Sequence, residues 1–111
     1  MLQKILEYAG GDEEGRDLLQ FVSDREQDWP SQLFERAELE KLLKSAIEKM
    51  PEVEQTVLGL YYQNELTLRE IATVMNLHES RVSQLKSQAV LRLRTYMERR
   101  WPTHGGVAVR G

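Results

Sequence analysis

The sequence predicts an all-α fold: a four-helix domain that contains a helix-turn-helix, preceded by an extended acidic arm. Apolar residues recur at intervals of three and four from residue 31 to about 99, which is the period of amphipathic helices. Capping and turn residues interrupt this pattern several times. The composition, 41% hydrophobic and 30% charged, is ordinary for a folded protein and excludes global disorder. No apolar run approaches the roughly 18 residues of a membrane span.

The first 30 residues are predicted to form an acidic arm with a short N-terminal helix. "MLQKILEYA" can form two helical turns before Gly10 and Gly11 stop it. The acidic stretch that follows is interrupted by Gly15 and ends at Pro30. It carries one apolar patch, made of Leu18, Leu19, Phe21 and Val22. We expect an extended arm that docks on another surface through this patch.

Two helices are predicted between residues 31 and 63. Ser31 suits the N-cap of the first, whose apolar stripe is Leu39, Leu42, Leu43, Ala46 and Ile47. Pro51 suits the first position of the second, and Glu52 and Glu54 lie near the positive end of its dipole. The stripe predicted for this second helix is Val53, Val57, Leu60 and Tyr61.

A short helix, a tight turn and a long helix are predicted from residue 67 onward. Thr67 and Glu70 match a capping box, so the short helix begins at Leu68 and runs for about two turns. Asn76 tolerates a left-handed conformation and allows the turn. The long helix runs from Glu79 to about residue 99 on the stripe Val82, Leu85, Ala89, Leu93 and Tyr96. Residues 101–111 are expected to form a flexible tail.

This pair of helices has the helix-turn-helix arrangement, whose second helix enters the major groove of DNA. Opposite its apolar stripe lie short polar side chains suited to base edges and phosphates: Ser80, Ser83, Gln84, Ser87 and Gln88, with Arg81 at the flank. Residues 66–111 carry 8 basic and 3 acidic side chains, whereas residues 1–65 carry 7 and 15. The excess positive charge therefore lies in the half of the chain that contains the proposed DNA-binding helix pair. A four-helix bundle with a solvated polar face remains the alternative.

The stretch "LYYQNELTLREI", followed by "ESRVSQLKSQAVLRLR", resembles region 4 of bacterial RNA polymerase sigma factors. The resemblance is strongest to alternative sigma factors of the flagellar and sporulation type, and it covers roughly residues 12–97. The acidic segment before residue 46 is similar in character to the connector between regions 3 and 4. Asn76 stands where the family usually has Gly, and His78 where it usually has Ser, Thr or Gly.

The resemblance implies that the domain reads the −35 promoter element and contacts the β flap of core RNA polymerase. It also implies that an anti-sigma factor can occupy the domain. With the polar face and the positive charge described above, the candidate DNA-binding residues are Arg69, His78, Glu79, Ser80, Arg81, Ser83, Gln84, Lys86, Ser87 and Arg92. Regions 2 and 3, which recognise and melt the −10 element, are not in this sequence. We therefore expect Met1 to lie within a longer sigma factor.

Other functional classes find little support in the residues. The absence of cysteine excludes disulfides and thiolate metal sites and fits a reducing cytoplasm. His78 and His104 lie far apart, and no phosphate loop or catalytic triad is visible. We expect no catalysis, cofactor, metal, small-molecule substrate or membrane contact. Two alternatives remain: a stand-alone helix-turn-helix regulator that dimerises on a palindrome, and a module that binds only protein.

Overall fold

The computed structural model describes residues 13–25 and 32–100. The predicted N-terminal helix at residues 1–9 and the predicted tail at 101–111 lie outside these ranges. The described elements, in order, are α2 (Glu13–Arg25), α3 (Gln32–Glu48), α4 (Glu52–Leu58), the π-helical segment η3 (Gly59–Gln63), α5 (Leu68–Met75) and α6 (Glu79–Arg100). These ranges contain no strand, so the predicted all-α class is confirmed.

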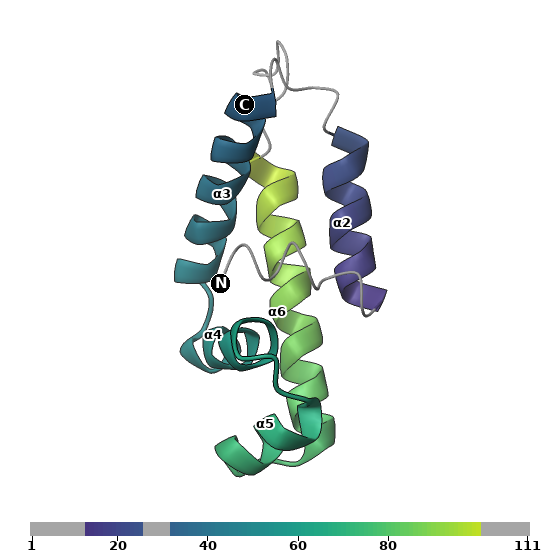
Figure 1. Ribbon diagram of the computed structural model, residues 1–111, viewed down its shortest axis with the longest axis vertical. Coiled ribbons are helices and arrows are strands. Elements are labelled where there is room, and N and C mark those ends of the chain that lie inside the picture. Colours follow the sequence, from purple (N-terminus) through teal and green to yellow (C-terminus); the bar gives the residue numbers. More distant parts are fainter. Residues whose placement is uncertain (1–12, 26–31, 101–111) are drawn as a thin grey trace.

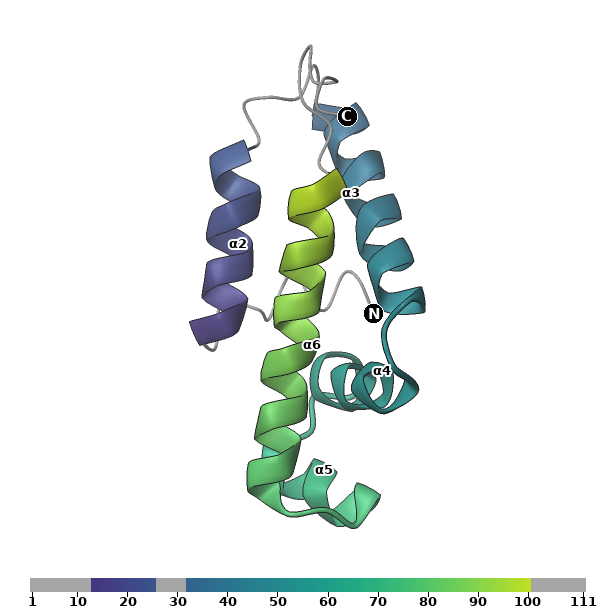
Figure 2. The ribbon, with the colours of Figure 1, turned by 180° about the vertical axis from the view of Figure 1, so that it is seen from behind.

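Helix α6 is the central helix of the described structure. Helices α2 and α3 flank its C-terminal half on opposite sides, while α4 and α5 pack against its N-terminal half (Figures 1 and 2). Four of the five predicted stripe positions of α6, Val82, Leu85, Ala89 and Leu93, are buried. The fifth, Tyr96, is half-buried, and Met97 takes the buried position beside it. No described helix has the length and apolar character that crossing a membrane requires.

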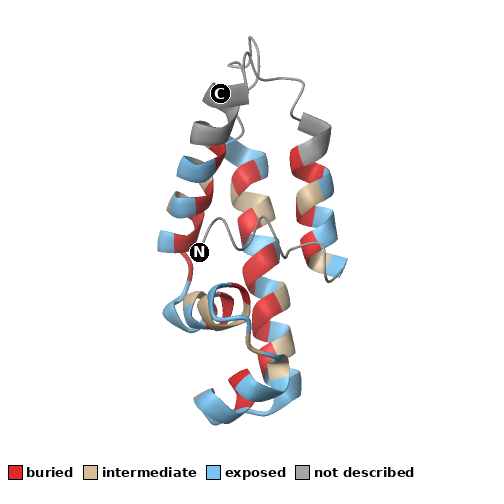
Figure 3. Cartoon of the chain, viewed as in Figure 1, coloured by how far each residue is buried: buried red, intermediate tan, exposed pale blue. Residues whose placement is uncertain are grey.

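Two hydrophobic cores lie along α6, as the buried positions in Figure 3 indicate. The helix-turn-helix core consists of Val57, Ile71, Ala72, Val82 and Leu85. The three-helix core is larger and joins α2 and α3 to the C-terminal half of α6, with Leu58 of α4 and Tyr62 of η3 packed against them. Its buried members are Leu18, Phe21, Val22, Leu39, Leu43, Ala46, Ile47, Met50, Leu58, Tyr62, Ala89, Val90, Leu93 and Met97.

The prediction of an extended arm is wrong for residues 13–25, which form helix α2. Leu18, Phe21 and Val22 are spaced by three and four residues, so one face of a helix carries all of them. They are 2%, 3% and 8% exposed against α6, and this burial outweighs the helix-breaking tendency of Gly15. The prediction that the patch docks on another surface is confirmed.

The helix predicted over residues 51–63 is confirmed as α4 and η3, but its buried face differs from the predicted stripe. Val53 is 40% exposed, and the buried positions are Glu54, Val57, Leu58 and Tyr62. The Asn64 N–H donates to the Gly59 carbonyl at 3.1 Å. This hydrogen bond joins residues five apart, as in a π-helix, so the side chains here do not follow the α-helical spacing that the predicted stripe assumed. Glu54 is buried because it has a cationic partner on α6, described below.

Candidate nucleic-acid interface

The start of α5 is fixed by the predicted capping box. The backbone N–H of Glu70 donates to Thr67 Oγ1 at 3.1 Å, and the backbone N–H of Thr67 donates to Glu70 Oε1 at 2.9 Å. Leu66 and Ile71, on either side of the cap, both pack in the helix-turn-helix core. The hydrogen bonds and the apolar pair together set the direction in which the chain enters α5.

The turn between the two helices is a Schellman closure on Asn76, which has φ 59° and ψ 47°. The Leu77 N–H donates to the Ala72 carbonyl at 2.9 Å, and the Asn76 N–H donates to the Thr73 carbonyl at 3.3 Å. The His78 carbonyl then accepts from two amides at the start of α6, those of Arg81 and Val82. The predicted left-handed turn at Asn76 is confirmed.

The helix-turn-helix core holds α6 firmly against α5. Ile71 and Val82 are fully buried, and the small side chain of Ala72 lets the two helix axes approach. Val57 of α4 closes the core from the third side. The N-terminal half of α6 therefore presents one fixed face to solvent.

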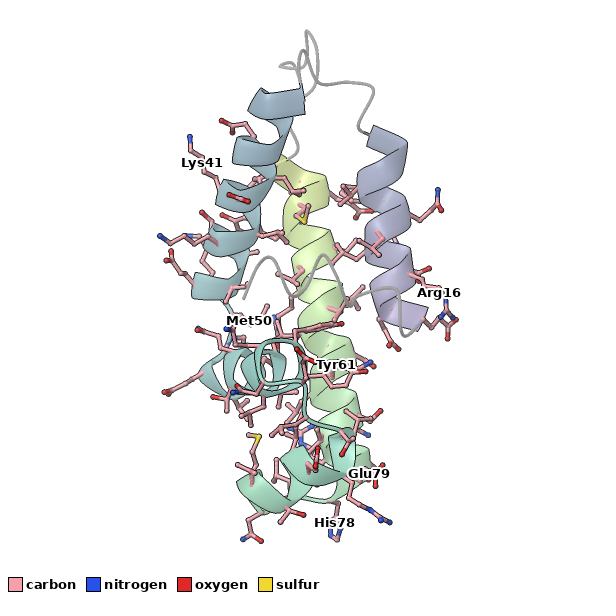
Figure 4. All side chains as sticks on the ribbon, in the orientation of Figure 1. Arg16, Lys41, Met50, Tyr61, His78 and Glu79 are labelled. Carbon is pink, nitrogen blue, oxygen red and sulfur yellow. The ribbon has the colours of Figure 1, made fainter. Side chains whose placement is uncertain are left out.

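Six of the ten predicted site residues lie exposed around this turn and on that face. They are Arg69, His78, Glu79, Ser80, Arg81 and Gln84, and together we call them the reading surface. Arg81 Nη1 donates to Gln84 Oε1 at 3.4 Å, so these two side chains meet across one helical turn. His78 and Glu79 lie at the tip of the molecule (Figure 4). The surface offers hydrogen-bond donors, hydrogen-bond acceptors and charged groups, which are the groups that proteins use to contact bases and phosphates.

Lys86 does not join the reading surface. It is only 5% exposed, and its Nζ donates to Glu14 Oε1 of α2 at 3.2 Å while lying 5.2 Å from the centre of the Tyr61 ring. Ser87 is half-buried and lies near the Glu14 carboxylate, whose pKa it helps to lower. The prediction that Lys86 contacts the DNA backbone does not fit this arrangement, because α2 covers that side of α6.

The acidity of Glu14 reflects these contacts. Burial alone would raise its pKa, but the hydrogen bonds from its own backbone, from Lys86 and from Ser87 outweigh that effect. The pKa of Glu14 therefore lies below its ordinary value of 4.5. The carboxylate stays charged and holds its partners at neutral pH.

Arg92 is also engaged by a carboxylate. Its Nε donates to Glu54 Oε1 at 2.7 Å; the Glu54 side chain is 3% exposed and that of Arg92 is 56% exposed. This ion pair ties α6 to α4, and no local sequence pattern reveals it because the partners are 38 positions apart. Within residues 13–25 and 32–100, no three His, Cys, Asp or Glu side chains are grouped to hold a metal ion.

Comparisons with known proteins agree with this arrangement. Residues 46–95 match the family model "Sigma-70, region 4". The chain is 44% identical over 93 residues to RNA polymerase sigma factor FliA of Salmonella typhimurium, covering 83% of this chain and 39% of that protein. It is 34% identical over 98 residues to RNA polymerase sigma-D factor of Bacillus subtilis, covering 88% and 39%.

A shorter match reaches 58% identity over 52 residues of FliA from Pseudomonas aeruginosa, covering 47% of this chain and 21% of that protein. The chain thus spans about two fifths of the length of the first relatives it matches, 39%. No solved structure matches the chain.

Proposed function

Residues 46–95 are a sigma-70 region 4 domain, and from this premise we propose that the chain recognises the −35 element of promoters. In this proposal it is the C-terminal part of an alternative sigma factor of the flagellar type and directs core RNA polymerase to its promoters. The observation that carries the proposal is the exposed reading surface, held on the helix-turn-helix core inside the matched range.

Arg81 and Gln84 are the proposed base readers. Both are exposed on the N-terminal half of α6, the part of a recognition helix that meets base edges. An arginine suits the two acceptors of guanine and a glutamine suits adenine. We propose that Glu79, which is exposed at the start of α6, accepts from the amino group of cytosine.

Arg69 and His78 are the proposed phosphate contacts at the rim of the same surface. Arg69 lies exposed on the first turn of α5, and His78 lies exposed in the turn before α6. Lys86 and Arg92 stay outside the proposed DNA surface because Glu14 and Glu54 hold them. Ser80 and Ser83, which are short, allow the helix to sit close to the bases.

Core RNA polymerase is the proposed protein partner. The relatives are named as RNA polymerase sigma factors, which favours this role over that of a stand-alone regulator. Tethering by the polymerase would raise the effective concentration of the domain at the promoter, so weak binding by the isolated domain suffices. We further propose that the chain acts in the cytoplasm, catalyses no reaction and is open to control by an anti-sigma factor.

Duplex binding tests the proposal. Arg81→Ala and Gln84→Ala should each cost about 1 to 3 kcal/mol in binding to a −35 duplex, measured by fluorescence anisotropy at fixed salt. Lys44→Ala, at an exposed position on α3 away from the reading surface, is the matched control and should change little. Unchanged binding of both variants would contradict the base-reading assignment. Failure of the chain to capture core polymerase in a pull-down would contradict the sigma-factor role.

A further inference from the structure

Helix α2 lies alongside α6 and packs chiefly on it (Figures 1 and 2). The two helices run in the same direction, so the first turn of α2, near Arg16, points toward the end of α6 that carries the reading surface (Figure 4). Glu14 in this turn accepts a hydrogen bond from Lys86 Nζ at 3.2 Å. Helix α2 thus lies over the flank of α6 next to the reading surface.

Lys86 lies where DNA bound at the reading surface would pass. It follows Ser83 by three residues and Glu79 by seven, so the three positions share one flank of α6. At about 1.5 Å per residue, Lys86 lies about 10 Å beyond Glu79 along the helix. The major groove of B-DNA is about 12 Å wide, so DNA read by the start of α6 has a bordering phosphate within reach of an extended Lys86 side chain.

With α2 docked, Lys86 does not make that phosphate contact. It is only 5% exposed, and its Nζ lies between the Glu14 carboxylate and the Tyr61 ring. The exposed carboxylate of Glu13, also in the first turn of α2, adds a second negative charge beside that of Glu14. The docked helix therefore withholds a cation from DNA and brings anions that repel phosphate.

Helix α2 can detach without disturbing the reading surface. It has 13 residues, one of them Gly15, and a helix this short is marginally stable in water by itself. It therefore stays helical only while its apolar side chains are buried on α6. The ion pair adds little, because the Glu14 side chain is 37% exposed. The described members of the helix-turn-helix core all lie outside α2, so this core keeps its packing when α2 leaves.

We propose that α2 is a removable cover of the DNA-binding face. Docked on α6, it withholds Lys86 and weakens DNA binding; when it detaches and unfolds, Lys86 contacts a phosphate. DNA binding and α2 docking therefore compete, and each weakens the other by the same factor. The inference rests on the proposed recognition of DNA and adds a means of regulating that site.

Duplex binding by the full chain, measured by fluorescence anisotropy at about 0.1 M salt, tests the cover; one phosphate contact is worth up to about eightfold at this salt. Leu18→Asn places an amide in the buried contact of α2, and by releasing α2 it should raise the affinity for a −35 duplex about fivefold. Lys86→Gln should lower the affinity about fivefold in the Leu18→Asn background and less than about twofold in the otherwise native chain.

A matched variant separates release of α2 from general damage to the three-helix core. Leu39→Asn makes the same change in this core, but on α3, and should leave the duplex affinity within about twofold. Equal gains in Leu18→Asn and Leu39→Asn would overturn the inference. An equal effect of Lys86→Gln in the two backgrounds would overturn it as well.

Hydrogen exchange tests the competition in the native chain and so does not depend on the folding of any variant. At fixed pH and salt, saturating −35 duplex should quicken exchange of the α2 amides about fivefold and leave the α3 amides unchanged. Unchanged or slower exchange of the α2 amides in the DNA-bound chain would contradict the competition between α2 and DNA.

A random-sequence duplex separates this inference from −35 recognition. Phosphate contacts carry no sequence information, so the random duplex should also loosen α2 once it is bound. Equal affinity for the two duplexes would contradict −35 recognition, whereas loosening of α2 by both would still support the cover. Binding of both duplexes without loosening of α2 would overturn the cover alone, and binding of neither would overturn both proposals.

Discussion

The two ends of α6 are built in different ways. Its N-terminal half packs in the helix-turn-helix core, whose members all lie between residues 57 and 85. Its C-terminal half packs in the three-helix core, which draws on residues as distant as Leu18 and Leu39. Contacts that are close in sequence fix the end of α6 that carries the reading surface, and long-range contacts fix the other end. The reading end should therefore keep its local geometry when the long-range contacts are weakened.

The substitution with the largest expected effect on stability disrupts the three-helix core. Leu93 is fully buried where this core meets α6, so Leu93→Ala should lower the free energy of unfolding by about 3 to 4 kcal/mol. Urea denaturation followed by circular dichroism measures the loss. A loss smaller than that of Ile71→Ala would contradict the expectation that truncation costs more in the larger core.

The substitution with the next largest expected effect disrupts the helix-turn-helix core. Ile71→Ala should cost about 2 to 3 kcal/mol, because the fully buried side chain is lost from a smaller cluster that can partly collapse. The −35 duplex affinity should fall with it, since Ile71 supports the face that carries the reading surface. Unchanged duplex affinity in a folded Ile71→Ala variant would show that the core does not position this surface.

The turn between α5 and α6 can be tested without touching either core. Asn76→Ala should cost about 1 kcal/mol, because Asn76 has φ 59° and alanine tolerates that conformation less well. Asn76→Gly is the matched control and should be neutral or slightly stabilising. Thermal denaturation distinguishes the two variants, and equal melting temperatures would contradict the role assigned to the turn.

Gly59 lies at the junction of the two cores, directly after Val57 and Leu58. It has helical φ and ψ, and an added Cβ would meet nothing within 4 Å. Gly59→Ala should therefore stabilise the fold by about 0.5 to 1 kcal/mol by reducing the entropy of the unfolded chain. A lower midpoint in urea would show that the π-helical segment needs glycine.

The smallest effect concerns the ion pair between Glu14 and Lys86. Because the pKa of Glu14 is lowered in the folded state, its contribution is present above pH 4.5 and is lost as the pH falls through the folded pKa. The Glu14 side chain is 37% exposed, so the effect should be about 0.5 kcal/mol or less. The protection of the α2 amides against hydrogen exchange, measured relative to the intrinsic exchange rate at each pH, should fall over that acidic range in the native chain. Glu14→Gln should remove the pH dependence, and its persistence would assign it to another group.

The sequence predicted the features that depend on neighbouring residues. The capping box of Thr67 and Glu70 and the left-handed Asn76 involve partners a few positions apart, and the structure has both. The helical state of residues 13–25 was missed, because the burial that stabilises α2 comes from α6. Lys86 was misplaced for the same reason, since Glu14 lies 72 positions away.

Continuous helix α6 also acts as a lever. Its 22 residues span about 33 Å, with the reading surface at one end and the three-helix core toward the other. A tilt of about 5° at the three-helix core would displace the reading surface by roughly 3 Å, close to the spacing of about 3.4 Å between successive base pairs. The packing of α2 and α3 on α6 would thus set where the proposed reading surface lies relative to DNA.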